Sequence, residues 1–350
     1  IPASEFAFVG DEGRLHDKKL ETKPVGYFKD AMIRFCKNKS SVVAAYIILF
    51  LVLYAIFVPI FCETTYSRAL TDTTYLMYTK LPPKVEGMGW LGMDGTGNVT
   101  VNEADYNSMR ALAQETGLDP VLEVYRAAYT DPTSSSKTTF YDLKVDNYYR
   151  MGMAYLTLTP DEFESIQAWQ DETGIQVIYP AITDTKQSDA NIWYEANRKG
   201  VATLDDEGNF QPIYKTTTPT DTTYHSLRIA ADNDPERPLA YARVGGTSSA
   251  PSYVVRVCKY TYFQYRYGFE PAFVFGTNAK GQDIFTRLAA GARFSFLLAI
   301  SISAINLFIG AIYGAIEGYY GGAVDLVMER IADVINGVPF IVVTTLFQLH

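Results

Sequence analysis

Three apolar runs divide the chain, and polar segments flank each of them. Residues 41–61, 294–316 and 334–349 contain no Asp, Glu, Lys or Arg. A helix needs about 20 apolar residues to cross roughly 30 Å of hydrocarbon, and in lipid it satisfies its own backbone hydrogen bonds. The pattern predicts transmembrane helices at 41–61, 293–316 and 334–350. The alternative, a buried helix of a soluble protein, fits one such run but poorly explains three.

The first run also has to be weighed against a signal peptide. The apolar core of a signal peptide has about 7–15 residues, follows a short basic segment and precedes a small-residue cleavage site. Residues 41–61 form a longer run behind a long polar segment, and the bulky residues 59–62 follow it. We therefore interpret the run as a permanent span.

Two further segments are predicted to be amphipathic helices at the membrane surface. In residues 27–39, the side chains of Phe28, Met32 and Phe35 share one face, and basic side chains occupy most of the other. Within residues 272–292, Ile284, Phe285 and Leu288 likewise share a face. The first segment belongs to an arm, residues 1–40, and the second is expected in the outer interface.

Charge predicts the orientation of the spans. Lys and Arg are in excess before the first span, which marks residues 1–40 as cytoplasmic. Residues 62–271 would then be extracellular and residues 317–333 a cytoplasmic loop or helix, although acidic residues outnumber basic ones in 317–333. Residues 63–270 carry 28 acidic and 18 basic residues, a net charge of −10, which excludes a nucleic-acid-binding face as a general property of this segment.

Residues 62–271 have the composition of a folded α+β domain, because aromatic residues occur throughout. Capping and alternation patterns predict helices at 100–117, 119–128 and 160–173, and strands at 153–159, 175–179 and 253–267. Cys62 and Cys258 both fall near the outer ends of spans. They either form a disulfide or remain two free thiols.

The chain carries no recognisable catalytic, cofactor or metal motif. It has three His, in distant parts of the sequence, and lacks His-Glu-x-x-His and Gly-x-Ser-x-Gly. It also lacks Gly-x-x-x-x-Gly-Lys-Ser/Thr, so any ATP that drives it must bind another chain. We expect no catalytic, cofactor-binding or metal-binding residues and no enzyme activity.

Small and polar residues within the apolar runs suggest helix packing and a transport path. Gly310, Gly314 and Gly318 recur every four residues and share one helix face, which lets another helix approach closely. Ordinary enrichment of Gly in membrane helices is the alternative. Asn306, Asn336 and Pro339 place a polar group or a kink within the apolar runs, so we expect them to line a path.

From residue 275 onward the sequence resembles the C-type permease subunit of oligopeptide and dipeptide ABC importers, in the Gram-positive type with a large extracellular insertion. Asn278 and Gln282 depart from the family, which often has Asp and Arg there. Residues 8–10, 27–31 and 37–39 agree with the same family. The positions that carry the resemblance are Gly276, Thr277, Gly281, Asp283, Arg287, Gly291, Arg293, Gly318, Gly321, Gly322 and Asp325.

The resemblance implies an α-helical polytopic membrane protein with the type I ABC importer permease fold, of which the first three spans are present, and an inserted α+β extracellular domain. It implies as partners a homologous permease subunit, two ATPase subunits that hold ATP and Mg, an extracellular peptide-binding lipoprotein, the peptide and the bilayer. It implies a bacterial, Gram-positive plasma membrane. The family's Glu-Ala-Ala coupling signature is absent from the sequence, so we expect a chain truncated in its third span.

The predicted function is therefore that of a permease subunit of an oligopeptide importer, which forms half of the path with its homologous partner. A membrane sensor or receptor with an extracellular ligand-binding domain is the alternative, but it does not explain the third apolar run. A membrane-anchored enzyme of the cell envelope would need a catalytic constellation that the motifs do not provide.

Overall fold

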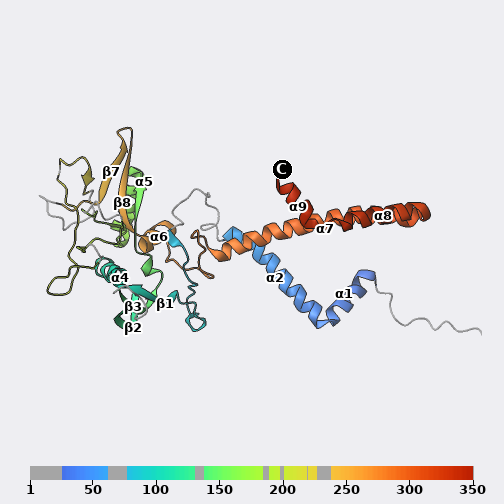
Figure 1. The fold of residues 1–350 in the computed structure, drawn as a ribbon, viewed down its shortest axis with the longest axis horizontal. Helices are drawn as coiled ribbons and strands as arrows, with labels where there is room; N and C mark the ends of the chain where they lie inside the picture. The colour runs from blue at the N-terminus through green and yellow to red at the C-terminus, as the bar shows by residue number, and fades with distance from the viewer. Residues whose placement is uncertain are drawn as a thin grey trace, which may run out of the picture. The chain divides into compact units, whose positions relative to one another are not determined.

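The computed structural model describes residues 26–61, 77–130, 138–183, 189–197, 201–218, 220–226 and 238–349. It divides into two compact units, residues 1–54 and 55–350. Cys62 and most of the amino-terminal arm lie outside the described residues. Figure 1 gives the labels of the elements.

Two helices open the described chain. Helix α1 (Tyr27–Lys37) confirms the predicted amphipathic segment, and an ion pair of 2.7 Å joins Asp30 to Arg34 one turn later. Asn38 separates it from α2 (Lys39–Phe61), and the Asn38 side chain accepts a hydrogen bond from the Ser40 amide at 3.1 Å. Helix α2 confirms the first predicted helix and is apolar and long enough to cross a membrane.

The region between α2 and α7, called here the central domain (residues 77–283), contains a first antiparallel sheet in the order β1-β3-β2. Its strands are β1 (Thr96–Asn102), β2 (Val121–Thr130) and β3 (Thr139–Asp146). Helix α4 (Glu103–Thr116) contacts all three strands. Val101, Met109, Leu143 and Val145 form the buried core between them.

A second antiparallel sheet has the order β4-β8-β7-β6, with β5 paired to the end of β8. Its strands are β4 (Met153–Leu158), β5 (Ile178–Tyr179), β6 (Tyr224–His225), β7 (Ala242–Thr247) and β8 (Ala250–Cys258). Helices α5 (Pro160–Thr173) and α6 (Lys259–Tyr267) pack on β8. The 3-10 turns η4 (Gly89–Leu91) and η5 (Tyr149–Met151) complete the domain. Two antiparallel sheets with separate helices give the predicted α+β architecture.

Local signals predicted β4 and α5 correctly. The Thr159 side chain accepts from the Glu162 amide, and the Glu162 carboxylate accepts from the Thr159 amide, so the capping box is complete. Gly174 ends the helix in the left-handed conformation, with φ of 71°. Strand β5 keeps only the last two residues of the strand predicted at 175–179.

Three predictions in this domain are wrong. Residues 119–128 were predicted helical, but residues from Val121 onward form β2, because pairing with β3 overrides their local preference. The strand predicted at 253–267 ends at Cys258, and residues 259–267 form α6 with its aromatic side chains packed on the sheets. The helix predicted from 100 begins at Glu103, because Asn102, not Thr100, is its N-cap.

A buried ion pair joins the two sheets. The Arg256 guanidinium on β8 donates to both Glu115 carboxylate oxygens on α4, at 2.6 and 2.5 Å, and the two side chains are 0% and 4% exposed. Arg256 also donates to the carbonyls of Ala190 (2.6 Å) and Pro180 (3.2 Å), and the Tyr214 hydroxyl donates to Glu115 (2.8 Å). The pair is therefore compensated by hydrogen bonds on both sides.

Three helices follow the central domain. Helix α7 (Ile284–Tyr320) has 37 residues, and Figure 1 shows it as one continuous helix. The prediction of a separate interfacial helix before a span at 293–316 is therefore wrong. No proline interrupts residues 284–320, and Gly291 alone does not end the helix. By length and apolarity, α7 is the second helix that can cross a membrane.

The third predicted span differs from the structure. Residues 334–337 belong to α8 (Gly322–Gly337), and α9 (Phe340–Leu349) has only 10 residues after the break at Val338 and Pro339. Among the described residues, only α2 and α7 have spanning length. The loop or helix predicted at 317–333 is helical except at Gly321, because α7 extends to Tyr320 and α8 begins at Gly322.

The Arg256–Glu115 pair yields a stability prediction. Replacing Glu115 by Ala leaves a buried, unpaired guanidinium, so we expect the central domain to lose about 3–5 kcal/mol of unfolding free energy. The matched control is Asp333→Ala, which removes an exposed ion pair to Arg330 of 3.1 Å and should cost less than about 1 kcal/mol. Denaturant unfolding of the full chain in detergent, followed by tyrosine and tryptophan fluorescence, measures both. Equal losses in the two variants would contradict the prediction.

Candidate functional site

The segments that enter and leave the central domain pair with each other next to the start of α7. We call this pairing the neck, residues 77–84 and 273–283. The Thr277 amide donates to the Leu81 carbonyl at 2.9 Å, and the Lys84 amide donates to the Phe273 carbonyl at 2.9 Å. The Lys80 amide donates to the Asn278 carbonyl at 3.1 Å. Segments nearly two hundred residues apart in the sequence are thus held together by backbone hydrogen bonds.

Thr277 ties the two segments together through its side chain. Its hydroxyl accepts from the Leu81 amide at 2.8 Å and donates to the Tyr78 carbonyl. Thr277 and Tyr78 are buried, and burial raises the pKa of the Tyr78 phenol well above its usual value. Because the hydroxyl donates and accepts at once inside the core, apolar replacement would leave two backbone groups unpaired.

Asp283 lies at the start of the long helix α7. Its carboxylate accepts from the amides of Phe285 (3.1 Å) and Thr286 (3.2 Å), and from the Thr286 hydroxyl. It is therefore the N-cap of α7, where a negative charge also stabilises the helix dipole. The Ile284 amide donates to the Gly276 carbonyl at 3.1 Å, which fastens the helix start to the neck.

Gly276 permits the closest approach in the neck. Its φ is 71°, and a Cβ atom placed on it would lie 2.2 Å from the Leu81 carbonyl oxygen. Both its conformation and its contact therefore require glycine. Gly281 has φ of 75° and closes the turn in which its amide donates to the Asn278 carbonyl at 3.0 Å.

The neck also contains Asn278 and Gln282, the two positions that depart from the resembled family. The Asn278 side-chain amide donates to the Gln282 side-chain oxygen at 3.2 Å, so a neutral hydrogen bond joins them. Asn278 also accepts from the Gln282 amide at 3.0 Å. Arg287 lies one turn into α7, where its amide donates to the Asp283 carbonyl at 3.1 Å. The structure thus brings Gly276, Thr277, Gly281 and Asp283 together, with Arg287 next to them.

The remaining predicted positions lie along α7, away from the neck in sequence. Among the described residues, no atom outside the helix's own nearby backbone lies within 4 Å of a Cβ built on any of the α7 glycines. These glycines are Gly291, Gly310, Gly314 and Gly318. Arg293 and Asn306 lie on the same helix, and Asn306 is exposed. The glycine face therefore leaves room at the backbone for a helix from outside the described residues.

A tight turn reverses the chain after α7. Gly321 and Gly322 have φ of 56° and 57°, and α8 then packs against the end of α7. The Tyr313 hydroxyl donates to the Met328 carbonyl at 2.5 Å across this hairpin. Asp325 lies in the first turn of α8, and Asn336 and Pro339 flank its end, all three exposed. The path that Asn306, Asn336 and Pro339 are expected to line stays a prediction.

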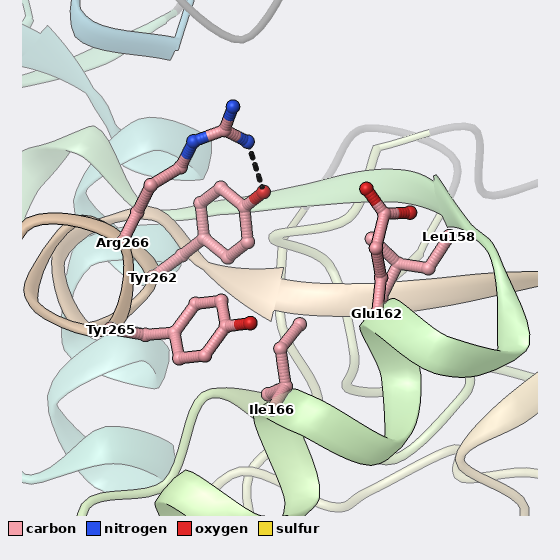
Figure 2. Close-up of a pocket in the computed structure, with 6 residues that line it drawn as sticks. All are labelled: Leu158, Glu162, Ile166, Tyr262, Tyr265 and Arg266. Atoms are coloured by element: carbon pink, nitrogen blue, oxygen red, sulfur yellow. Dashed lines mark hydrogen bonds between the residues drawn. The ribbon is translucent and has the colours of Figure 1, made fainter.

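The central domain has its own concave surface between α5 and α6, shown in Figure 2. The cavity has a volume of about 310 Å³, at the small end for ligand pockets. Arg266 donates to the Tyr262 hydroxyl at 3.0 Å on one side, and Glu162 projects on the other. Burial raises the pKa of the Tyr265 phenol between them. Its lining is Leu158, Glu162, Ile166, Tyr262, Tyr265 and Arg266, none of which the sequence singled out as a site residue.

The arrangement of the described residues explains how the central domain is attached to α7 and how α7 can pack against another helix, better than it explains any catalysis. In the part of the chain that the structure describes, no group of three or more His, Cys, Asp or Glu side chains is placed to hold a metal ion. Cys258 is a free, buried thiol there, and burial raises its pKa. Sequence reasoning missed Tyr78 and Leu81 as partners of Thr277, because only long-range pairing identifies them.

Gly276 yields a second prediction. Replacing it by Ala should separate the neck, because the new Cβ meets the Leu81 carbonyl oxygen, and the amides of Leu81 and Thr277 should exchange at least tenfold faster with deuterium. Gly117→Ala is the matched control, since Gly117 has φ of 74° but no described atom within 4 Å of a Cβ. It should lower the free energy of unfolding by only about 1–2 kcal/mol, the cost of a left-handed backbone conformation at a residue with a Cβ. Unchanged exchange at the neck in Gly276→Ala would contradict the prediction.

Comparison with known proteins finds similarity to a family of transport permeases. The family model for the N-terminal transmembrane domain of oligopeptide transport permease C matches residues 26–83, from the start of α1 to the first segment of the neck. No solved structure matches the chain significantly.

Curated relatives agree with this match. A dipeptide transport system permease protein of Lactococcus lactis subsp. cremoris is 43% identical over 77 residues, 22% of each chain. A dipeptide permease protein of Bacillus subtilis is 41% identical over 75 residues, 21% of this chain and 23% of its own. An oligopeptide transport system permease protein of Haemophilus influenzae is 44% identical over 77 residues, 21% of this chain and 25% of its own.

These matches are short but consistent. The chain spans about a quarter or less of the length of these relatives. All three are named as transport permeases rather than enzymes. The family model and the relatives agree with each other in kind. Over these short matches, the chain is similar to C-subunit permeases of oligopeptide and dipeptide transport.

Proposed function

We propose that the chain is a transmembrane permease subunit of an ATP-driven oligopeptide importer and forms half of the peptide path with a homologous partner. The observation that carries the proposal is the open glycine face of α7 in a chain that is similar to this permease family. A helix that can cross a membrane and has backbone room along one face is suited to pack against another spanning helix. The substrate class follows from the names of the relatives.

The partners follow from the same proposal. A homologous permease subunit would pack on the glycine face, and two ATPase subunits would hold ATP and Mg, because this sequence has no phosphate-binding loop of the Walker type. An extracellular peptide-binding lipoprotein would deliver the peptide. The central domain would dock this protein or cover the mouth of the path. No step of this function is a chemical reaction catalysed by the chain itself.

The proposed orientation places α1 in the cytoplasm and the central domain outside a bacterial plasma membrane. Basic residues of α1 support it, since Lys29, Arg34 and Lys37 lie just before α2. A single crossing by α2 then puts the central domain on the opposite side, and α7 returns.

A substitution on α7 tests the function. Gly314→Ile fills the open face and should lower the uptake of a radiolabelled oligopeptide about 5- to 30-fold, because loss of about 1–2 kcal/mol of helix packing weakens the complex by that factor. The measurement uses cells whose own gene has been replaced by each variant. Ile312→Phe adds volume to the opposite face of the same helix and should leave uptake nearly unchanged. Full uptake with Gly314→Ile, or no peptide uptake by the unmodified chain, would overturn the proposal.

The orientation is tested separately with a membrane-impermeant maleimide. Cys36 is exposed and Cys258 is buried, so a chain with Cys62→Ser keeps Cys36 as its reactive thiol. We expect Cys36 to react in inverted vesicles but not in intact protoplasts. A second chain with Cys36→Ser, Cys62→Ser and Ser249→Cys carries its thiol on the exposed turn between β7 and β8 and should show the reverse pattern. Labelling of Cys36 from outside would contradict the orientation.

A further inference from the structure

Three apolar side chains are exposed together on one loop beside the neck. We call residues 85–93 the Trp90 loop. Trp90 is 81% exposed, Leu91 54% and Met88 42%. Single exposed apolar residues are common on soluble domains. Three within four residues, including a Trp, call for a covering surface.

The loop is ordered by its own backbone. The Met88 amide donates to the Val85 carbonyl at 3.1 Å, the Leu91 amide donates to the Met88 carbonyl at 3.0 Å, and the Val85 amide donates to the Met93 carbonyl at 2.9 Å. Gly92 adopts φ of 74° to close the 3-10 turn η4. The apolar tip is therefore held outward by a fixed turn and does not fold back to hide its side chains.

The same loop is joined directly to the neck. Lys84 and Asp94 pair as an antiparallel bridge at its base, and the Lys84 amide donates to the Phe273 carbonyl at 2.9 Å. The other segment of the neck also exposes apolar side chains, since Phe275 is 46% exposed. The neck continues through the Asp283 cap into α7. The Trp90 loop thus lies at the end of the central domain from which the membrane helix starts.

The distances along the chain are compatible with contact to lipid. Between Asp283 and Phe294, where the uncharged run begins, α7 rises about 16 Å at 1.5 Å per residue. The interfacial layer occupies about 5–7 Å of that rise. This leaves about 9–11 Å for the loop and its side chains to bridge. Residues 85–88 form a turn closed by the Met88–Val85 hydrogen bond, so the Trp90 and Leu91 side chains have to supply part of that reach.

We propose that the Trp90 loop docks in the interfacial layer of the bilayer that α7 crosses, and so fixes the central domain on the membrane surface. Trp is suited to this layer, because its ring is apolar and its indole N–H stays hydrogen-bonded. Residues 85–93 contain no Lys or Arg and one acidic residue, Glu86, so the attraction is apolar and does not depend on anionic lipid. The inference rests on the proposed membrane crossing of α7.

Quenching by brominated lipid tests this contact. The full chain is reconstituted in phosphatidylcholine vesicles whose acyl chains carry bromine close to the headgroup, and its tryptophan fluorescence is compared with that in unbrominated vesicles. The chain has three Trp, of which Trp193 is buried and Trp169 packs on Tyr265 with ring centroids 5.8 Å apart. We expect the quenched fraction to fall at least threefold in Trp90→Phe and to persist in Trp169→Phe. Both variants keep an aromatic ring at the substituted position.

Flotation on a density gradient distinguishes failure of the loop docking from failure of the proposed membrane crossing. Vesicles that float with the chain and show equal quenching in the original chain and in Trp90→Phe would overturn the docking of the loop while leaving the membrane crossing intact. That outcome would leave a protein partner as the occupant of the apolar tip. A chain that does not float with vesicles would overturn the membrane crossing and the loop docking together.

Discussion

The constraint on which the rest of the structure depends is the closure of the neck. Between α2 and α7 the chain has to bring two segments that are distant in sequence, residues 77–84 and 273–283, next to each other. The hydrogen bonds around Thr277 hold them together. Closing a long loop costs little more entropy than closing a short one. A folded central domain whose own ends are adjacent lowers that cost further. Gly276 allows the two backbones to approach, and Asp283 converts the end of the neck into the first turn of α7.

Two consequences follow from this attachment. Helix α7 is not a bare span that begins at the apolar run, because its first turns, with Thr286 and Ala289, are buried and joined to the neck. A movement of α7 at the neck would therefore be transmitted to the central domain without a flexible linker at that junction. The match to the family model ends at residue 83, inside the first segment of the neck.

The sequence predicted those elements whose signals are local. Pro160 at the start of α5, Gly174 at its end and the apolar run of α2 all lie in or next to the element that they define. The sequence located helix α7 but predicted two helices in its place, because the residues change there from an amphipathic to a uniformly apolar pattern. The backbone has no break at that change. Strand β2 and helix α6 were missed, because partners far along the chain decide their conformation.

The candidate site shows the same division. The family motif identified Gly276, Thr277 and Asp283. It did not show which contacts require these residue types. The Cβ clash with Leu81 and the hydroxyl bridge to Tyr78 involve residues that lie far away in the sequence. Arg256 and Glu115, 141 residues apart, carry no local signal at all. The glycine spacing of α7 was visible in the sequence, whereas its lack of a described neighbour needed the coordinates.

The most direct test of the central claim, that this chain is one subunit of a multi-chain importer, is a purification of the native protein in mild detergent with mass spectrometry of its companions. The proposal predicts a second, homologous permease on the glycine face of α7, and two ATPase chains that carry the Walker-type phosphate-binding loop that this sequence lacks. Recovery of the chain alone, or with a kinase in place of the ATPases, would contradict the claim and favour a membrane sensor.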